Sequence, residues 1–262
     1  MSGRPTSWAF PYFDAPGGVV ALAHRGFSLS GLENSMAAFA GAVDLGFGYV
    51  ETDAHATRDG VAVALHDASL DRTTDAHGLV AELPWAKVRE ARIGGVEPVP
   101  LLEDVLGTWP DLRVNIDVKA ASGAVPVAEA VARTGAWDRV CVTSFSRARR
   151  RATLTALGRA VATSAATGEV AAFVGAARLR SARLARCALA DVQALQVPVR
   201  QGPVTVVDRS TVAAAHRAGR QVHVWTINAV DHMHQLLDLG VDGLVTDRAE
   251  LLEKVLRARG VW

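Results

Sequence analysis

Short apolar runs alternate with helix-like segments along the whole chain. Many of these runs are apolar on both faces, which is typical of parallel strands buried between two layers of structure. Eight strands are predicted, at residues 19–23, 49–56 with a continuation at 61–65, 113–118, 140–145, 161–166, 194–199, 221–227 and 243–246.

Between the predicted strands, apolar side chains recur at helical spacing. The predicted helices cover residues 34–45, 101–109, 125–134, 147–157, 169–179, 209–217, 231–239 and 249–257. Alternation of strands and helices indicates a parallel sheet with helices packed outside it. Eight such units in a chain of 262 residues predict an α/β fold, the closed (β/α)8 TIM barrel. A doubly wound open sheet is the alternative, but the first strand is followed by HRGFSLSG, which lacks the G-x-G-x-x-G spacing.

The regular alternation is interrupted once, after the second predicted strand. The 33 residues 68–100 contain polar turns and only weak periodicity. A connection of this length is uncommon in a compact domain, so we expect a short insertion that forms a small excursion or lid over one barrel mouth. No low-complexity tract or linker divides the chain, and we therefore expect a single domain over residues 1–262.

The composition is that of a globular protein with a sizeable core. Half of the residues are hydrophobic, and 28 Lys and Arg against 27 Asp and Glu leave a net charge of +1. This balance argues against a nucleic-acid partner and against a disordered chain. The only cysteines, Cys141 and Cys187, have no C-x-x-C spacing, so we expect two buried thiols in a reducing compartment rather than a zinc or redox site.

Nothing in the sequence predicts membrane insertion. Prolines interrupt the first eighteen residues, which contain no continuous apolar stretch of the kind found in a signal peptide. No segment approaches the ~18 uncharged apolar residues of a membrane span. We therefore expect a cytoplasmic protein without stable membrane insertion, whose oligomeric state the sequence leaves open.

Acidic side chains gather where the second and third predicted strands end. Active sites of TIM barrels lie at the carboxyl ends of the strands. Glu51 and Asp53 are two residues apart on a strand and so share one face, and Asp117 lies on the next strand of the barrel. Three carboxylates at one mouth need a neutralising cation, and oxygen ligands suit Mg²⁺ or Ca²⁺. The alternative is an ion-pair network in which Lys119 neutralises the carboxylates.

Histidines and basic residues flank these carboxylates. His24 and His66 end neighbouring predicted strands and are candidates for general acid–base catalysis, although a strand histidine can also be a hydrogen-bonded structural residue. Arg25 and Lys119 are candidate phosphate ligands, and the alternative for Arg25 is a salt bridge to a nearby carboxylate. Trp225 at the end of the seventh predicted strand could stack on an apolar part of a substrate or pack in the core.

Several short motifs follow one another in a fixed order. They are His24-Arg25-Gly26, Glu33-Asn34, Glu51 with Asp53, Thr57 with Asp59-Gly60, His66-Asp67, Leu70 with Arg72-Thr73-Thr74, NIDVK at 115–119, VWTIN at 224–228 and GVDGLVTDRAELL at 240–252. In this order, and over most of the chain, they resemble the glycerophosphodiester phosphodiesterase family. The resemblance implies a TIM barrel with a short insertion after the second strand.

The resemblance also implies a reaction. It implies metal-dependent hydrolysis of a glycerophosphodiester, a small-molecule substrate, to sn-glycerol 3-phosphate and an alcohol. Transferred to this sequence, the family's acid–base pair is His24 and His66. Its metal carboxylates, for a divalent ion such as Mg²⁺ or Ca²⁺, are Glu51, Asp53 and Asp117, and its phosphate-contacting residues are Arg25 and Lys119. Many family members have Glu at the position of Asp117, so the third ligand has a shorter side chain here.

Three questions stay open at the level of sequence. The nucleophile could be water or the neighbouring glycerol hydroxyl, which would give a cyclic phosphate first. A lysophospholipase D-like reaction on the same barrel would need an apolar surface near the mouth, for which the insertion with Leu79, Val80, Leu83 and Trp85 is the candidate. A non-catalytic phosphate-binding barrel is the third possibility, although binding alone requires neither histidine.

Overall fold

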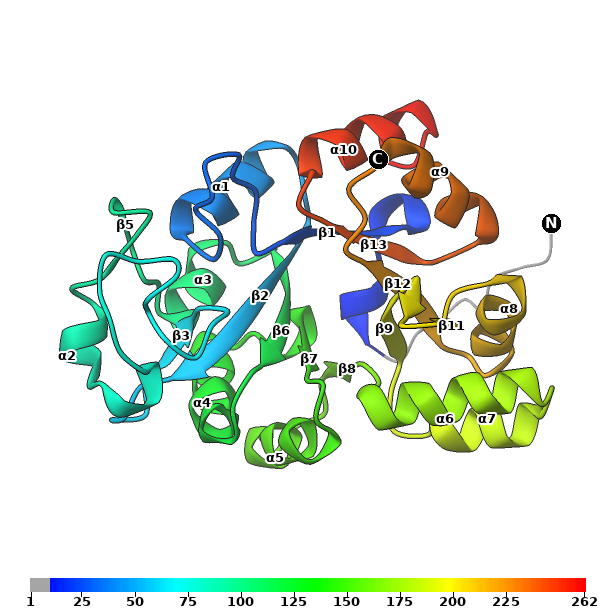
Figure 1. Cartoon of the computed structure of the whole chain (residues 1–262), viewed down its shortest axis with the longest axis horizontal. Helices are drawn as coiled ribbons and strands as arrows, with labels where there is room; N and C mark the ends of the chain where they lie inside the picture. Colours follow the sequence, from blue (N-terminus) through cyan, green and yellow to red (C-terminus); the bar gives the residue numbers. More distant parts are fainter. Residues whose placement is uncertain (1–9) are drawn as a thin grey trace.

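The computed structural model describes residues 10–262 and shows eight parallel strands arranged around a barrel (Figure 1). Residues 1–9 lie outside the described part. They belong to the first eighteen residues, for which the sequence predicts no signal peptide. Along the sheet the strands follow the order β8, β7, β6, β2, β1, β13, β12, β9. Their bounds are β1 Val20–His24, β2 Tyr49–Ala56, β6 Arg113–Val118, β7 Val140–Thr143, β8 Ala162–Thr163, β9 Ala194–Pro198, β12 Gln221–Trp225 and β13 Gly243–Thr246.

The barrel closes between β8 and β9, which are joined by few hydrogen bonds. The backbone N–H of Gln193 donates to Thr163 at 3.0 Å, and that of Ala165 donates to Ala194 at 2.9 Å. Ser164 and Ala194 form one parallel bridge. The predicted (β/α)8 barrel and all eight predicted parallel strands are therefore confirmed.

Helices cover the outside of the sheet. The eight that correspond to predicted segments are α1 Met36–Asp44, α3 Leu102–Thr108, α4 Ala124–Thr134, α5 Arg147–Leu157, α6 Thr167–Arg178, α8 Arg209–Arg217, α9 Val230–Leu239 and α10 Ala249–Ala258. Their apolar stripes face the strands, as in α10, where Leu252, Val255 and Leu256 are buried. Across residues 10–262, no helix combines the length and the apolar character needed to cross a bilayer.

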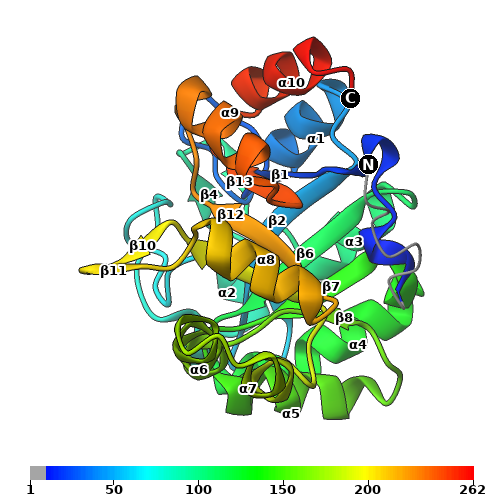
Figure 2. The same cartoon turned by 90° about the vertical axis from the view of Figure 1, so that its right-hand side faces the viewer.

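Outside the insertion, one helix and two strands were not among the predicted elements. A short helix, α7 Ala182–Ala188, follows α6, where a single helix was predicted. A two-stranded hairpin, β10 Arg200–Gln201 with β11 Val204–Thr205, follows β9 and projects from the barrel (Figure 2). Each of these two strands has only two residues, which is too short for an alternating pattern to be recognised.

The insertion has a small core of its own. The strand before it, β3 Ala62–Ala64, is the predicted continuation of the second strand and pairs antiparallel with β2. The insertion itself forms η3 Val80–Glu82, α2 Trp85–Val88, β4 Arg92–Ile93 and β5 Glu97–Pro98. Eight buried residues make one cluster, namely Val63, Leu65, Leu70, Val80, Val88, Ala91, Ile93 and Val99, with Leu83 and Trp85 packed against it. Most of the insertion's apolar side chains are thus used internally. That residues 1–262 form one domain stays a prediction.

The amino-terminal end of the barrel is filled by the segment that precedes β1. Tyr12 and Phe13 lie on a short 3-10 helix and are buried in a cluster with barrel residues that include Tyr49 and Cys141. The Tyr49 hydroxyl donates to the Tyr12 carbonyl at 2.7 Å. The structure confirms the expected burial of Cys141, whereas Cys187 is exposed on α7, so the prediction for Cys187 was wrong.

A buried ion pair fixes the start of α6. The Arg150 side chain is fully buried, and its Nη2 atom donates to Glu169 Oε1 at 2.9 Å. The other oxygen of Glu169 accepts from the backbone N–H of Ala166 at 2.8 Å, next to the end of β8. This carboxylate therefore joins α5, α6 and the β8 connection.

We expect Glu169→Gln to lower the free energy of unfolding by about 3–5 kcal/mol, because it leaves the Arg150 charge buried without a counterion. Urea denaturation followed by circular dichroism measures the change. The control is Arg151→Gln, which removes an exposed ion pair with Asp191 and should cost less than about 1 kcal/mol. Equal losses in the two variants would contradict the role of Glu169.

Candidate active site

One cavity at the carboxyl ends of the strands contains every site residue predicted from the sequence. Its volume is about 500 Å³. It is lined by His24, Arg25, Glu51, Asp53, His66, Asp117, Lys119 and Trp225, which come from β1, β2, β6 and β12 or from the loops that follow β1, β3 and β6. The fold thus brings together residues that are up to 201 positions apart in the chain, His24 and Trp225.

Asp53 is the most enclosed carboxylate of the cavity, with 1% of its surface exposed. Lys119 Nζ lies 2.7 Å from Asp53 Oδ1 and 2.7 Å from Asp117 Oδ2, so it bridges the two strands. Arg25 Nε lies 3.0 Å from Asp53 Oδ2. Burial would raise the pKa of Asp53, but the charges of Lys119 and Arg25 hold it below its usual value.

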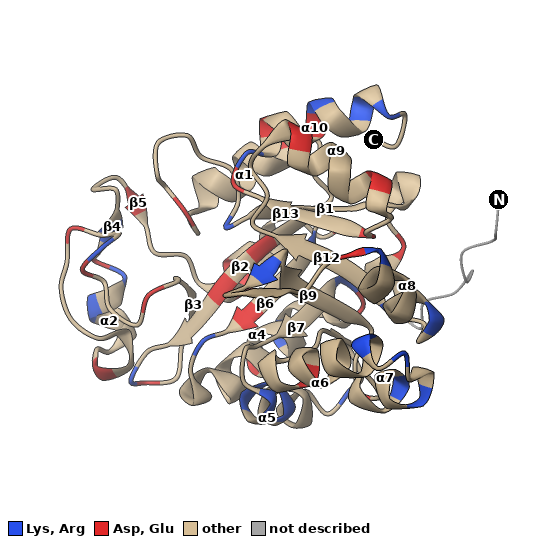
Figure 3. Cartoon of the chain, turned by 45° about the vertical axis from the view of Figure 1, so that its right-hand side comes forward, with Lys and Arg blue, Asp and Glu red and all other residues tan. Residues whose placement is uncertain are grey.

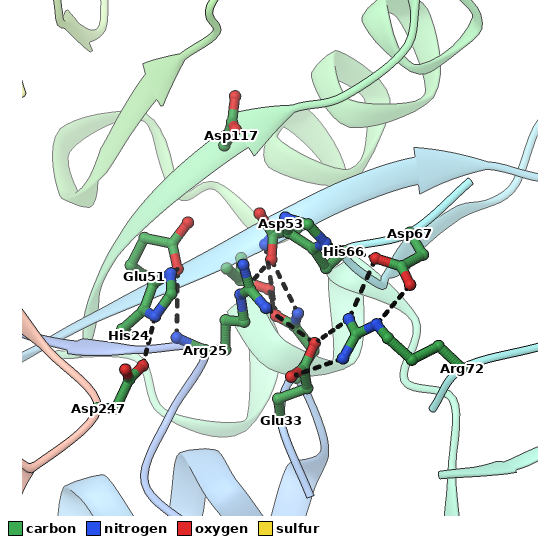
Figure 4. Close-up of polar contacts among 12 residues, drawn as sticks. His24, Arg25, Glu33, Glu51, Asp53, His66, Asp67, Arg72, Asp117 and Asp247 are labelled. Carbon is green, nitrogen blue, oxygen red and sulfur yellow. Dashed lines mark hydrogen bonds and ion pairs between the residues drawn. The ribbon is translucent and has the colours of Figure 1, made fainter. Parts of the chain in front are cut away.

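Glu51 has a different environment. Its Oε2 atom accepts a hydrogen bond from the Arg25 backbone N–H at 3.2 Å and lies 3.8 Å from His24 Nε2 (Figure 4). Burial, together with the nearby charge of Asp53, raises the pKa of Glu51. The negative charge of Glu51 is therefore less well neutralised than that of Asp53, and a further cation would stabilise it.

Some features of the three carboxylates fit the binding of a divalent ion. Asp117 Oδ1 is buried and has no hydrogen-bond partner among the described residues. That orphaned oxygen, the incompletely neutralised Glu51 and an all-oxygen donor set fit a hard cation. Within residues 10–262, however, no three His, Cys, Asp or Glu side chains are arranged as a ready metal site. In the arrangement seen, Lys119 pairs with Asp53 and Asp117, as in the ion-pair alternative.

His24 is oriented by the last strand of the barrel. Its Nδ1 atom lies 2.6 Å from Asp247 Oδ1, and the Asn228 amide donates to the other oxygen of Asp247 at 2.8 Å. Burial lowers the pKa of His24, but the hydrogen bond to Asp247 and the charge of Glu51 outweigh it, and the pKa is raised. The Nε2 atom of the ring is left to face Glu51.

His66 is held by a chain of alternating charges (Figure 4). Its Nδ1 atom lies 2.6 Å from Asp67 Oδ1, and Arg72 Nε donates to Asp67 Oδ2 at 2.5 Å. Arg72 also donates to Glu33 at 2.7 Å, and Glu33 accepts from Arg25 at 2.9 Å. The hydrogen bond from Arg72 is the main reason that the pKa of Asp67 is far below its usual value. Arg72 thereby links the insertion to the phosphate-binding candidates.

The loop after β1 adopts a conformation that few residues tolerate. Arg25 and Asn34 both lie in the left-handed region, at φ 57° and 59°. Between them Gly26 has φ 81°, and a Cβ atom there would lie 2.6 Å from the Ala38 backbone. The buried Asn34 amide donates to Asp53 Oδ2 at 3.0 Å. The loop is therefore kept in a costly conformation that places Arg25 beside Asp53.

The opposite wall of the cavity is apolar. Trp225 meets Phe145 edge to face, with ring centroids 5.9 Å apart, and Lys119 Nζ lies 5.8 Å from the centroid of the Phe145 ring. The rest of this wall consists of Ala165, Val170, Ala171, Val174, Val197, Pro198, Val204 and Val206. The apolar surface near the mouth was expected on the insertion, but none of Leu79, Val80, Leu83 and Trp85 lines the cavity, so that location was wrong.

Sequence reasoning did not assign several residues that organise this site. Asp247, Asn228, Asn34 and Arg72 all lie in motifs noted along the chain, but no role was derived for them. The role of Asp247 could have been predicted from closure of the barrel, because β13 pairs with β1 and places Thr246 beside Ala23. A polar residue at the end of the last strand is then a neighbour of His24.

Comparison with known proteins identifies the family of the chain. The model of the glycerophosphoryl diester phosphodiesterase family matches residues 24–251. The chain is 49% identical over 247 residues, 94% of each chain, to the probable glycerophosphodiester phosphodiesterase 2 of Mycobacterium tuberculosis. Its fold is similar to a glycerophosphodiester phosphodiesterase from Agrobacterium tumefaciens, with a TM-score of 0.74, 21% identity and coverage of 91% and 99% of the two chains. It is also similar to an Oleispira antarctica phosphodiesterase in complex with the product sn-glycerol-3-phosphate, with a TM-score of 0.74, 22% identity and coverage of 90% and 96%. The chain belongs to the glycerophosphoryl diester phosphodiesterase family.

Proposed function

We propose that this protein hydrolyses glycerophosphodiesters to sn-glycerol 3-phosphate and an alcohol by general acid–base catalysis with His24 and His66. The observation that carries the proposal is that each of these histidines lines the same cavity and has a carboxylate partner of its own, Asp247 or Asp67. The cytoplasmic location expected from the sequence stays a prediction.

Arg25 and Lys119 bind the phosphate in this proposal. Both side chains are largely buried and both lie against Asp53, which holds them at the cavity wall. A phosphodiester carries one negative charge, and further charge develops on its oxygens in the transition state. Two fixed cations stabilise that charge without needing to reorganise, which is how such groups lower a barrier.

His24 is assigned as the general acid. Its raised pKa favours the protonated form that a general acid requires, and Asp247 holds the ring so that Nε2 faces the cavity. Protonation of the leaving alkoxide by this nitrogen would overcome the poor leaving ability of an alcohol.

His66 is assigned as the general base. Its partner Asp67 accepts from Arg72, which fixes the carboxylate and with it the ring orientation. The proton is taken from water or from the neighbouring glycerol hydroxyl, and the two routes differ in whether a cyclic phosphate is formed. Analysis of early products by ³¹P NMR distinguishes them.

We further propose that Glu51, Asp53 and Asp117 hold a divalent ion, Mg²⁺ or Ca²⁺. The buried, unpartnered Asp117 Oδ1 and the raised pKa of Glu51 support added positive charge here. Such an ion supplies Lewis-acid stabilisation of the phosphoryl oxygens when bound. Lys119 already pairs with Asp53 and Asp117 in the structure, so a bound ion would share these two carboxylates with it.

The apolar wall favours a second candidate, lysophospholipase D-like cleavage of a monoacyl glycerophosphodiester. Ten apolar residues of the cavity lie opposite the charged groups, and Phe145 and Val204 are 59% and 41% exposed. A substrate with a small polar alcohol makes no use of this wall, whereas one acyl chain would cover it and be stabilised by the hydrophobic effect. A barrel that only binds phosphate would need neither the histidines nor their carboxylate partners.

We expect His24→Ala and His66→Ala each to lower kcat for glycerophosphocholine by roughly 10²- to 10⁴-fold, with a smaller effect on KM. Steady-state release of glycerol 3-phosphate measures this. The control is His77→Ala, since the His77 side chain is 85% exposed on the insertion and is not part of the cavity. Near-normal turnover of either active-site variant would remove that histidine from the mechanism.

Asp247→Asn should move the alkaline limb of the pH profile of kcat to lower pH. The Asp247 carboxylate raises the pKa of His24, so its loss lowers that pKa, and the protonated acid disappears at a lower pH. A merely structural role would lower kcat at every pH without moving the limb.

Glu51→Gln and Asp117→Asn should weaken Mg²⁺ or Ca²⁺ binding in calorimetric titrations, because each removes one anionic oxygen ligand while keeping its size. Asp117→Glu should retain binding. The control is Asp231→Asn on the exposed start of α9. Full activity in excess chelator, with no bound metal, would exclude the ion from the reaction, and an unchanged circular dichroism spectrum would show that chelation spares the fold.

Val204→Ser should lower the ratio of kcat/KM for a monoacyl glycerophosphocholine to that for glycerophosphocholine, since it makes the apolar wall more polar. Val96→Ser is the matched control, because Val96 is an exposed valine on the insertion and does not line the cavity. If only the unacylated substrate is cleaved, or if both variants change the ratio equally, the second candidate is wrong.

A further inference from the structure

The chain's near-neutral charge conceals a strongly basic region. Residues 147–220 contain thirteen arginines, three carboxylates and no lysine, a net charge of +10, so the rest of the chain carries −9 to give the total of +1. This region comprises α5, α6, α7, α8 and their connections. Figure 3 shows Lys and Arg gathered over α5, α7 and the end of α8.

Several exposed arginines around α7 have no acidic partner among the residues that the structure describes. Arg147 and Arg151 pair with Asp191, and Arg150 pairs with Glu169. In contrast, within residues 10–262 no ion pair joins a carboxylate to the exposed side chains of Arg180, Arg183, Arg186, Arg209 and Arg217. Arg180 and Arg217 line one small hollow between α6, α7 and α8, so the unpaired charges come from adjacent helices.

Two leucines lie among these arginines and face outward. Leu179 is 74% exposed and Leu184 is 50% exposed, in the sequence RLRSARLAR at 178–186. The inward side of α7 is used by Ala185, which is 2% exposed. Leu179 caps the end of α6 and Leu184 lies on α7. Exposed leucines among unpaired arginines are unusual for a surface that contacts only water, and the combination of basic and apolar side chains is typical of segments that lie in a membrane interface.

The basic region adjoins the rim of the catalytic cavity. Val170, Ala171 and Val174 of α6 form part of the apolar wall, and α7 and α8 pack against α6. At the far end of α6, Arg178 donates to the Thr205 carbonyl of the β10–β11 hairpin at 2.9 Å. A surface bound to α7 would therefore lie next to the elements that build the apolar wall.

We propose that Leu179, Arg180, Arg183, Leu184 and Arg186, the arginine–leucine surface, dock this protein on an anionic phospholipid surface. The arginines attract anionic headgroups, and the leucines enter the interface between headgroups and acyl chains. A single-stranded nucleic acid is less favoured, because residues 178–186 offer no aromatic side chain on which a base could stack. A duplex presents phosphates but no apolar layer that would cover Leu179 and Leu184. The proposal does not depend on the catalytic function.

The experiment is sedimentation of the full chain with phosphatidylcholine vesicles prepared with and without phosphatidylglycerol. We expect binding only to the anionic vesicles, and weaker binding as salt is added. Arg183→Gln/Arg186→Gln should lower the partition coefficient roughly tenfold at low ionic strength. Leu179→Ser/Leu184→Ser should also lower it while leaving the charge unchanged, which separates insertion from simple attraction.

The matched control is Arg58→Gln/Arg89→Gln, which also removes two positive charges from exposed arginines. Arg58 lies in the turn after β2 and Arg89 lies in the insertion. It should keep most of the binding. The proposal is overturned if the wild type fails to bind anionic vesicles, if both arginine pairs weaken binding equally, or if the protein prefers duplex DNA to vesicles. The four substituted residues in α7 and the turn before it are exposed, so the variants should keep their fold. Circular dichroism of each variant checks this and separates loss of folding from loss of binding.

Discussion

The charge of one buried carboxylate organises the active site. Asp53 is almost inaccessible to water, and an isolated charge in such a place would be strongly unfavourable. Its partners are therefore obligatory: Lys119 after β6, Arg25 after β1 and the Asn34 amide, each within 3.0 Å. Since these partners come from two loops, after β1 and after β6, neutralising Asp53 also fixes the positions of the two cations that face the substrate.

Barrel closure provides the second half of the site. β1 lies between β2 and β13, so His24 has Glu51 on one side and Asp247 on the other. The first and last strands must pair before the histidine acquires the partner that raises its pKa. The site is consequently a property of the complete barrel, even though most of its residues lie in the first half of the chain.

Much of this arrangement could be predicted from the sequence, for physical reasons. Parallel strands buried on both sides give long apolar runs, and polar residues at their carboxyl ends must share one mouth. This reasoning placed His24, Asp53 and Lys119 in one cavity. It did not locate the apolar wall, because an apolar segment such as that around Val80 and Trp85 looks the same whether it lines a cavity or packs in a satellite core. The sequence pattern also did not predict β10 and β11, because each strand has only two residues and shows no alternating pattern.

The insertion and α6 hold the two sides of the cavity in place through separate ion pairs. The insertion contributes charge, since Arg72 connects Asp67 to Glu33 and so orders the side that holds the histidines. α6 contributes apolar surface, but its start is fixed by the buried pair of Arg150 and Glu169. Loss of that pair would leave the charged side intact while the apolar wall loses its support. The reaction centre and the surface that selects the substrate can therefore vary independently within one barrel, because different ion pairs hold them in place.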